Sequence, residues 1–564
     1  MDTTNRPRFW IGALVGGLLT APLIVIFALV AQLVGTPFVP FDVFDWSSRV
    51  LPGPLIEFGI STIVKTINAL KLGETSSTAK LAEQTMAIGG LIATGVIVGA
   101  ILFEYMRRNG TPKNRYLPGL IAGLVLGIPV MFISQSINQL ATTSPIVSAA
   151  WTLIAFAGWG VVLNWVYYRL TEPRVAPATA AAASTSTTSV TEPVNGFQAI
   201  DRRNFLIKVG GATAAITVVG AGLGALLAQG TVPEANTGPT DVLMPANAGD
   251  QPWSATHALP NADAAVMAVP GTRPELTPLA NHYRIDINTL PPVIKETEWN
   301  LPFTGLVDNP ITLKLADIRN NYTPIDQFVT LACISNPVGG DLIGTTRWTG
   351  VPLRDILKDV KLQSNATHLR ITSADDFDEV VDLETVMNDG RVILAYEWDG
   401  LPLATKHGFP LRIYIPNHYG MKQPKWITNI EAIPQWEAGF WVRRGWDKDA
   451  FMQATSVIDT VATDSIITTG DQKFVPIGGI AHAGDRGISQ VQIRVDDQDY
   501  VEAQLRTPMS DTTWVIWRYD WPFAAGSHTF TVRCVDGKGT QQIETVADVL
   551  PAGATGLVST RASL

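Results

Sequence analysis

A single cysteine in the second half of the chain stands where a thiolate could bind a metal. Residues 328–332 form an apolar run, which predicts a buried strand that ends beside Cys333, and the glycine-containing loop 334–341 follows. A soft thiolate at the end of a strand, facing a loop, is a suitable metal ligand. Cysteine also often fills space in protein cores. This stretch alone therefore allows two interpretations, a metal ligand or a buried core residue.

Cationic, aromatic and amide side chains gather in three short motifs on either side of this cysteine. Residues 281–286 read NHYRID, residues 407–412 read HGFPLR, and residues 419–426 read YGMKQPKW. Cations and hydrogen-bond donors of these kinds can hold a flat polar ring system and a phosphate. A simpler interpretation exists for the first motif, in which Arg284 only forms a local salt bridge with Asp286.

The three motifs, in this order around Cys333, resemble those of the sulfite oxidase family. The resemblance covers the chain from about residue 281 to residue 564, about half of its length. It implies a mononuclear molybdenum carried by one molybdopterin and bound by one protein thiolate. By this resemblance, Cys333 would be the metal ligand.

The resemblance also assigns roles to other residues of these motifs. Contacts to the pterin and its phosphate are implied for Asn281, Tyr283, Arg284, Ser373, His407, Arg412, Lys422 and Lys425. Arg284 and Trp348 would join Cys333 at the catalytic centre. Two alternatives stay open, because Lys422 could be a solvated surface charge and Trp348 could serve only in core packing.

The chain departs from the family pattern on the substrate side. Sulfite oxidases follow the ligand cysteine with Ala-Gly-Asn-Arg-Arg, whereas residues 334–338 here are Ile-Ser-Asn-Pro-Val, and Ile285 replaces a second family arginine. Each lost charge-assisted hydrogen bond to a dianion costs on the order of 1.5–3 kcal/mol. The sequence therefore favours oxygen-atom transfer on a small sulfur compound that is neutral and sulfoxide-like.

Two other functions remain open at this stage. One is a sulfite dehydrogenase in which Arg284, Arg443 or Arg444 replaces the lost cations in space. The other is a cofactor-free, membrane-anchored binding or scaffold protein, for which the large anchor without a visible electron carrier would be the argument. The joint presence of Cys333 and the cationic motifs favours a molybdopterin-dependent oxidoreductase over both.

The composition indicates a membrane protein with several regions. The 564 residues are 46% hydrophobic and 16% charged, which is too apolar for a single soluble domain. A net charge of −9 gives no basic surface for nucleic acid. Cys333 and Cys534 are too few for a disulfide framework, and Cys534 lies in an alternating strand pattern that predicts a core position.

Four apolar runs in the first third of the chain are long enough to cross a bilayer, namely residues 9–34, 85–106, 117–140 and 149–168. They predict a membrane domain of four helices over residues 1–172. A flexible linker over 173–200 and a fifth membrane helix over 201–230 follow. Residues 55–70 are shorter and carry charges at helical spacing, which predicts a helix that lies at the membrane surface.

Basic residues between the apolar runs predict the orientation. They precede the first run and lie between the second and third and between the fourth and fifth, whereas residues 138–148 contain none. Because basic loops stay in the cytoplasm, we expect a multi-pass protein of the cell membrane with a cytoplasmic N-terminus and an extracytoplasmic catalytic half. Arg202 and Arg203 resemble a twin-arginine export signal, although they could be ordinary cytoplasmic charges.

The remaining regions complete an expected fold of three parts, an α-helical membrane domain, an α+β molybdopterin domain and a β-sandwich. Residues 231–280 predict an extended spacer, 281–446 the α+β catalytic domain, and 447–564 short strands with Gly or Asp turns. The family's C-terminal domain is immunoglobulin-like and often dimerises, which implies a homodimer. No histidine precedes His257, so we expect no haem in the membrane helices and a separate electron carrier, a cytochrome or quinone system.

Overall fold

The structure is a computed structural model, and it describes residues 6–70, 72–110, 112, 114–137, 143–171, 202–230 and 251–564. The described chain divides into two compact units. Unit 1 contains Met1–Val50 and Glu83–Val232, and unit 2 contains Leu51–Ala82 and Pro233–Leu564. The predicted linker 173–200 lies outside the described residues, as does the first part of the predicted spacer.

Unit 1 is helical. Its helices are α1 (Phe9–Val34), α2 (Val39–Val50), the larger part of α4 (Thr75–Asn109), α5 (Leu117–Ile137), α6 (Pro145–Thr171) and α7 (Arg202–Gly230). Among the described residues, 5 helices are long and apolar enough to cross a membrane: α1, α4, α5, α6 and most of α7. This confirms the predicted spans and indicates a multi-pass membrane protein.

Glycines allow helices α5 and α6 to approach each other closely. A Cβ added at Gly119 or Gly123 of α5 would overlap backbone atoms of Gly160 or Phe156 in α6. Small residues at such positions are typical of helix packing in lipid, where close backbone approach replaces the hydrophobic effect as a source of stability. The close packing of α5 against α6 therefore requires glycine at positions 119 and 123.

We expect Gly123→Leu to destabilise the helix pair, because the added side chain would overpack the interface. The expected loss is about 1–3 kcal/mol in the free energy of unfolding. The measurement is the fraction of monodisperse protein that remains after heating in detergent. Gly158→Leu is the matched control on α6, because a Cβ there would meet no atom within 4 Å. Equal melting curves for the two variants would show that the close approach contributes nothing.

The part of unit 2 that contains Cys333 has two five-stranded sheets with separate strand orders. The first sheet has the order β2-β1-β10-β5-β6, with β1 Leu301–Gly305, β2 Thr312–Leu313, β5 His368–Ser373, β6 Asp378–Asp382 and β10 Ile427–Ile433. The second has the order β3-β4-β7-β8 with β9 on β7, and its strands are β3 Ile325–Ala332, β4 Ile343–Pro352, β7 Ile393–Trp398, β8 Leu401–Pro402 and β9 Arg412–Tyr414.

Three short helices lie among these strands: α9 (Leu315–Asn321), α10 (Leu353–Val360) and α11 (Leu383–Asn388). The apolar residues Leu353, Ile356 and Val360 recur at helical spacing on α10, so one face of the helix is buried in the core. The core also contains Ile371 of β5 and Leu394 of β7, both 0% exposed. The predicted α+β fold is confirmed.

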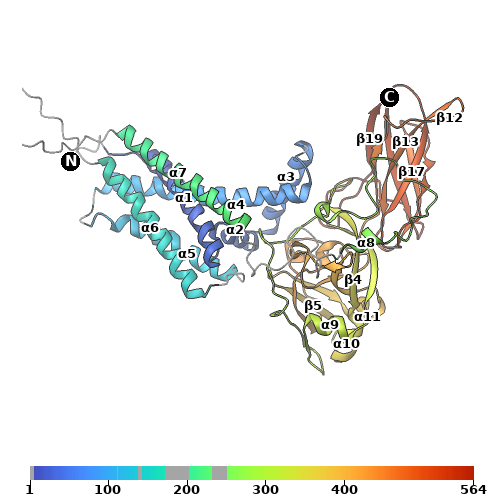
Figure 1. The fold of residues 1–564 in the computed structure, drawn as a ribbon, viewed down its shortest axis with the longest axis horizontal. Helices are drawn as coiled ribbons and strands as arrows, with labels where there is room; N and C mark the ends of the chain where they lie inside the picture. Colours follow the sequence, from blue (N-terminus) through green and yellow to red (C-terminus); the bar gives the residue numbers. More distant parts are fainter. Residues whose placement is uncertain are drawn as a thin grey trace, which may run out of the picture. The chain divides into compact units, whose positions relative to one another are not determined.

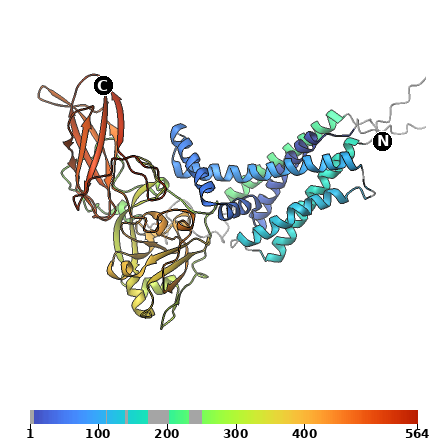
Figure 2. The ribbon, with the colours of Figure 1, turned by 180° about the vertical axis from the view of Figure 1, so that it is seen from behind.

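The C-terminal part of unit 2 is a sandwich of two antiparallel sheets. Its strands are β11 Thr455–Val461, β12 Ile467–Thr469, β13 Gln472–His482, β14 Ile488–Val495, β15 Val501–Glu502, β16 Gln504–Leu505, β17 Val515–Pro522, β18 Ser527–Asp536 and β19 Val558–Ser563. They run side by side in both views (Figures 1 and 2). Ile493, Trp517 and Phe530 pack in one core with Cys534, as predicted for that cysteine. The arrangement agrees with the predicted immunoglobulin-like sandwich.

Residues 51–82 belong to unit 2, although the sequence analysis assigns them to the membrane domain. They form α3 (Gly53–Leu70) and the first turns of α4. Their polar contacts with the rest of unit 2 include those of Lys65 with Asp548, Thr75 with Asp341, and Lys80 with Asp286. The predicted helix is present. Its apolar side chains Leu55 and Phe58 are exposed, as a helix at a membrane surface would require, and that location stays a prediction.

Candidate functional site

Cys333 follows β3 directly, and its backbone fixes the loop that comes next. The Cys333 amide donates to the carbonyl of Leu342 at 2.9 Å, and the Asn336 amide donates to the Cys333 carbonyl at 3.1 Å. The Asn336 side chain accepts from the Leu342 amide at 2.9 Å and closes the loop. The thiol is 3.0 Å from the Ser335 hydroxyl. A buried, well-positioned sulfur therefore stands at the edge of the sheet.

Two buried tyrosines lie near Cys333, and a thiolate at that position would raise the pKa of each. Burial raises the pKa of Tyr283 well above its usual range, and the charge of Cys333 raises it further. Burial likewise raises the pKa of Tyr419 to about 12, again with a contribution from Cys333. A Cβ at Gly420 would lie 2.8 Å from the Tyr283 hydroxyl, so the phenol can occupy this position only because residue 420 has no side chain. Both phenols remain protonated at neutral pH.

Two buried histidines share one tryptophan beside these tyrosines. The rings of His282 and His407 each lie 4.7 Å from the ring of Trp398, and they are 5.6 Å from each other. Within the described residues, neither Nε2 atom has a hydrogen-bond partner. Burial lowers the pKa of His282 to about 3 and that of His407 well below its usual value. Both rings are therefore neutral, and each keeps one nitrogen available for a ligand.

Arg412 brings a buried cation to the same place. Its Nη1 donates to the carbonyl of His407 at 3.0 Å, and its guanidinium lies 4.5 Å from the centre of the Trp348 ring. Its Nε has no partner within the described residues. Burial lowers the pKa of Arg412 to about 10, which leaves it charged at neutral pH. Trp348 is 0% exposed, so the structure places it in the core beneath Arg412.

Three cations meet one carboxylate in the first motif. Asp286 contacts Arg284 Nε at 2.6 Å, Lys80 Nζ at 3.0 Å and Lys425 Nζ at 3.3 Å. Burial alone would raise the pKa of Asp286, but the charges of the three cations outweigh burial and hold it well below its usual range. The local salt bridge considered for Arg284 is formed, and it ties Arg284 and Lys425 together.

Two further predicted residues occupy other surroundings. Lys422 is buried and pairs with Glu379 at 2.8 Å, so it is not the solvated charge that the sequence left open. Ser373 ends β5, and its hydroxyl is buried without a partner among the described residues. Asp375 follows closely, and burial raises its pKa while the charge of Lys425 opposes that change. The charge of Asp375 therefore interacts with the cationic group around Asp286.

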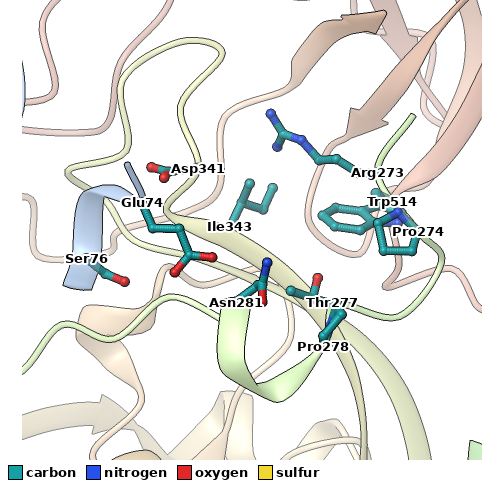
Figure 3. A pocket seen from close by; sticks show the side chains of 10 residues that line it. All are labelled: Glu74, Ser76, Arg273, Pro274, Thr277, Pro278, Asn281, Asp341, Ile343 and Trp514. Atoms are coloured by element: carbon teal, nitrogen blue, oxygen red, sulfur yellow. The ribbon is translucent and has the colours of Figure 1, made fainter. Parts of the chain in front are cut away.

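Asn281 lies on a cavity of about 200 Å³ whose lining residues are Glu74, Ser76, Arg273, Pro274, Thr277, Pro278, Asn281, Asp341, Ile343 and Trp514 (Figure 3). Figure 3 shows the carboxylates of Glu74 and Asp341 around the same space as the amide of Asn281. Arg273 is the one cation among these residues, and it pairs with Asp459 at 3.0 Å. Ile343 is the strand partner of Ala332, so the cavity lies beside the end of β3.

The structure thus gathers most of the predicted residues but adds others that the sequence analysis missed. His282 stands between two predicted residues of the first motif, and that position was its only signal. Asp375 follows Ser373 by two positions. Lys80 comes from a helix more than 200 residues earlier, since it bonds to Asp286 across a separation of 206 residues. Among the described residues, no group of three or more His, Cys, Asp or Glu side chains could hold a metal ion.

Comparisons with known proteins agree on one kind of domain. The family model "Oxidoreductase molybdopterin binding domain" matches residues 288–441. The sulfite oxidase of Arabidopsis thaliana is 28% identical over 274 residues, 40% of this chain and 70% of that protein. The human mitochondrial sulfite oxidase is 25% identical over 284 residues, 42% of this chain and 52% of that protein, so the match spans about half of its length.

Two further matches cover smaller or more distant relatives. The uncharacterized oxidoreductase YuiH of Bacillus subtilis (strain 168) is 29% identical over 150 residues, 27% of this chain and 73% of that protein. The crystal structure of the sulfane dehydrogenase SoxCD from Paracoccus pantotrophus superposes with a TM-score of 0.42 at 18% identity, over 49% of this chain and 78% of that chain.

Proposed function

Because this chain is a molybdopterin-binding oxidoreductase of the sulfite oxidase family, we propose that it transfers an oxygen atom to or from a small, neutral, sulfoxide-like compound. The molybdopterin-binding domain implies a molybdenum cofactor, and the candidate membrane spans imply an anchored enzyme. When bound, the cofactor supplies two-electron oxygen-atom chemistry that no side chain provides. The finer parts of this function rest on the side chains around Cys333.

The buried polar atoms of the site fit a molybdopterin. Buried donors and acceptors normally find a partner, because an unpaired one costs about 1–3 kcal/mol. His282 Nε2, His407 Nε2, Arg412 Nε and the Ser373 hydroxyl have none within the described residues. A polar ring system with a phosphate would supply partners of both kinds, with Arg412 and Lys425 as its cations. Cys333 would supply the thiolate, and the protonated phenols of Tyr283 and Tyr419 would stand beside it.

The main support for a neutral substrate is the acidic character of the loop after Cys333 and of its surroundings. Residues 334–341 contain no Lys or Arg and end in Asp341. Asp341 shares the neighbouring cavity with Glu74, and the cation of that lining, Arg273, is already neutralised by Asp459. A dianion such as sulfite that approached through this cavity would meet two carboxylates, whereas a neutral sulfoxide would meet no such repulsion.

The arginines that could have replaced the lost family cations have other partners. Arg284 pairs with Asp286 at 2.6 Å and Arg443 pairs with Asp378 at 2.5 Å. Arg444 donates to the carbonyl of Phe440 at 2.8 Å and lies over the ring of that residue. A sulfite dehydrogenase that used one of these three arginines would need its present contact to break, which favours the sulfoxide-like substrate over that alternative.

The metal itself separates this proposal from a cofactor-free binding protein. We expect the purified protein to contain about one molybdenum per chain, and Cys333→Ser to lose it, because a serine hydroxyl is a poor substitute for a soft thiolate. Elemental analysis of both proteins is the measurement. Cys534→Ala is the matched control, since Cys534 lies in the sandwich core, and it should keep its metal. Full metal content in Cys333→Ser would remove the central assignment.

The substrate proposal predicts turnover of dimethyl or methionine sulfoxide with artificial electron carriers, and weak activity on sulfite. Two lost cationic contacts would lower sulfite affinity by roughly a hundredfold or more. Glu74→Gln should lower the KM for sulfite by roughly threefold to tenfold and leave the KM for sulfoxide nearly unchanged. Efficient, strongly salt-sensitive sulfite oxidation without sulfoxide reduction would show that the substrate is the anion.

We also propose an extracytoplasmic position for the catalytic part, supported by the basic residues at the ends of the apolar helices. The electron carrier, a cytochrome or quinone system, would then meet the enzyme outside the cytoplasm, and the sandwich would be the dimer contact. These statements rest on loop charges and on the family resemblance.

Protease added to intact spheroplasts should then cut the C-terminal half. The double variant Arg202→Lys/Arg203→Lys should keep that half inside, because it preserves the charge but removes the twin-arginine pair. Arg107→Lys/Arg108→Lys, at the end of α4, is the matched control and should leave the topology unchanged. Cleavage from the cytoplasmic side alone would reverse the proposed orientation.

A further inference from the structure

The first turns of helix α4 contribute one side chain, that of Lys80, to the candidate cofactor site. Lys80 Nζ lies 3.0 Å from Asp286 Oδ1, and it donates to the carbonyls of Asp286 and Asn288, each at 3.0 Å. An ammonium has three protons to donate, and these contacts provide an acceptor for each. The Lys80 side chain is 10% exposed, so this is a buried connection and not a surface ion pair.

Lys80 shares its carboxylate with two residues that the proposed cofactor needs. Arg284 and Lys425 both contact Asp286 Oδ2, at 2.6 Å and 3.3 Å, while Lys80 contacts Oδ1. Arg284 Nη2 also donates to Oδ1, at 3.3 Å, so removal of Lys80 would take away the shorter of these two cation contacts to that oxygen. A buried carboxylate is unstable unless its negative charge is balanced by nearby cations. Asp286 would therefore change position, and Arg284 and Lys425, which are bound to it, would move as well.

The same segment also contacts the loop after Cys333. The amide of Thr75, the first residue of α4, donates to Asp341 Oδ2 at 2.8 Å. Thr75 and Lys80 are both buried, at 1% and 8% exposure. The start of α4 therefore connects the end of loop 334–341 with the motif 281–286, and helix α4 itself goes on to form a candidate membrane span.

We propose that Lys80 is a positioning residue of the molybdenum site. Lys80 holds Asp286 in place, and Asp286 in turn positions Arg284 and Lys425. The cofactor would therefore be retained as long as the start of α4 stays bound to this site. This inference rests on the proposed cofactor site. It makes residues 51–82 part of the cofactor-binding structure in addition to their place before a membrane span. Docking of this segment and retention of the cofactor would then stabilise each other, as linked equilibria must.

The test uses the full-length holoenzyme in detergent and the variant Lys80→Met, which keeps the apolar stem and removes the ammonium. After transfer to cofactor-free buffer with mild denaturant, molybdenum and pterin are measured in the protein over time. We expect the loss from Lys80→Met to be at least about tenfold faster than from the wild type. Lys80→Arg should restore most of the retention.

Lys65→Met is the matched control. Lys65 lies on the same segment and pairs with Asp548 at 2.8 Å, but both side chains are more than 60% exposed. Such surface pairs contribute little, so this variant should retain cofactor as the wild type does. Wild-type retention in Lys80→Met, or equal losses in Lys80→Met and Lys65→Met, would overturn the inference. A wild type with molybdenum and an unaffected Lys80→Met would leave the proposed function standing, whereas a wild type without molybdenum would refute both.

A second measurement needs no variant. Wild-type protein from molybdate-starved cells should be cleaved by protease within residues 51–82 several-fold faster than the loaded protein, because cofactor and docking stabilise each other. Cleavage elsewhere in the chain provides the internal reference. Equal cleavage of this segment in the two proteins would contradict the inference even if Lys80→Met failed to accumulate.

Discussion

The buried carboxylate of Asp286 is the interaction on which the candidate site depends. Its side chain is 1% exposed, and it is surrounded by cations from three separate stretches of the chain, which supply Arg284, Lys425 and Lys80. A lone buried carboxylate would be strongly destabilising, whereas three cations around Asp286, even with Asp375 nearby, leave an excess of positive charge. Such a group is stable next to an anion. This property connects the fold of the site with the anionic cofactor that its family uses.

The neighbouring side chains show the same physical character. His282, His407 and Arg412 are buried around Trp398 and Trp348, and each keeps a polar atom without a partner within the described residues. Burial of such groups opposes folding unless a ligand satisfies them. Under the proposed function, the bound cofactor would give these atoms partners and offset the stability that their burial costs.

The proposed substrate preference rests on a different set of charges. The cofactor side of the site is cationic, whereas loop 334–341 and the adjoining cavity present Asp341 and Glu74. The family arginines that would bind an oxyanion are absent from the loop, and Arg284, Arg443 and Arg444 are held in other contacts. Under the proposed function, one domain would hold an anionic cofactor on its cationic side and disfavour a second anion beside loop 334–341.

The sequence alone determined those features that depend on local pattern. Length and apolarity identified the membrane helices, and strand periodicity identified the sandwich around Cys534. Residue types and spacing identified the motifs near Cys333, His407 and Arg412. Each of these signals lies within a few residues of the chain, where helix or strand geometry fixes which side chains can meet.

Only the tertiary structure decided the partners of these residues. It paired Lys422 with Glu379, placed Trp348 beneath Arg412, and joined residues 51–82 to the catalytic part. Lys80 meets Asp286 across 206 residues, and no periodicity or motif encodes such a separation. The charge of a side chain can be read from the sequence, but its partner is set by which segments the folded core brings together, because burial and distance decide which opposite charges meet.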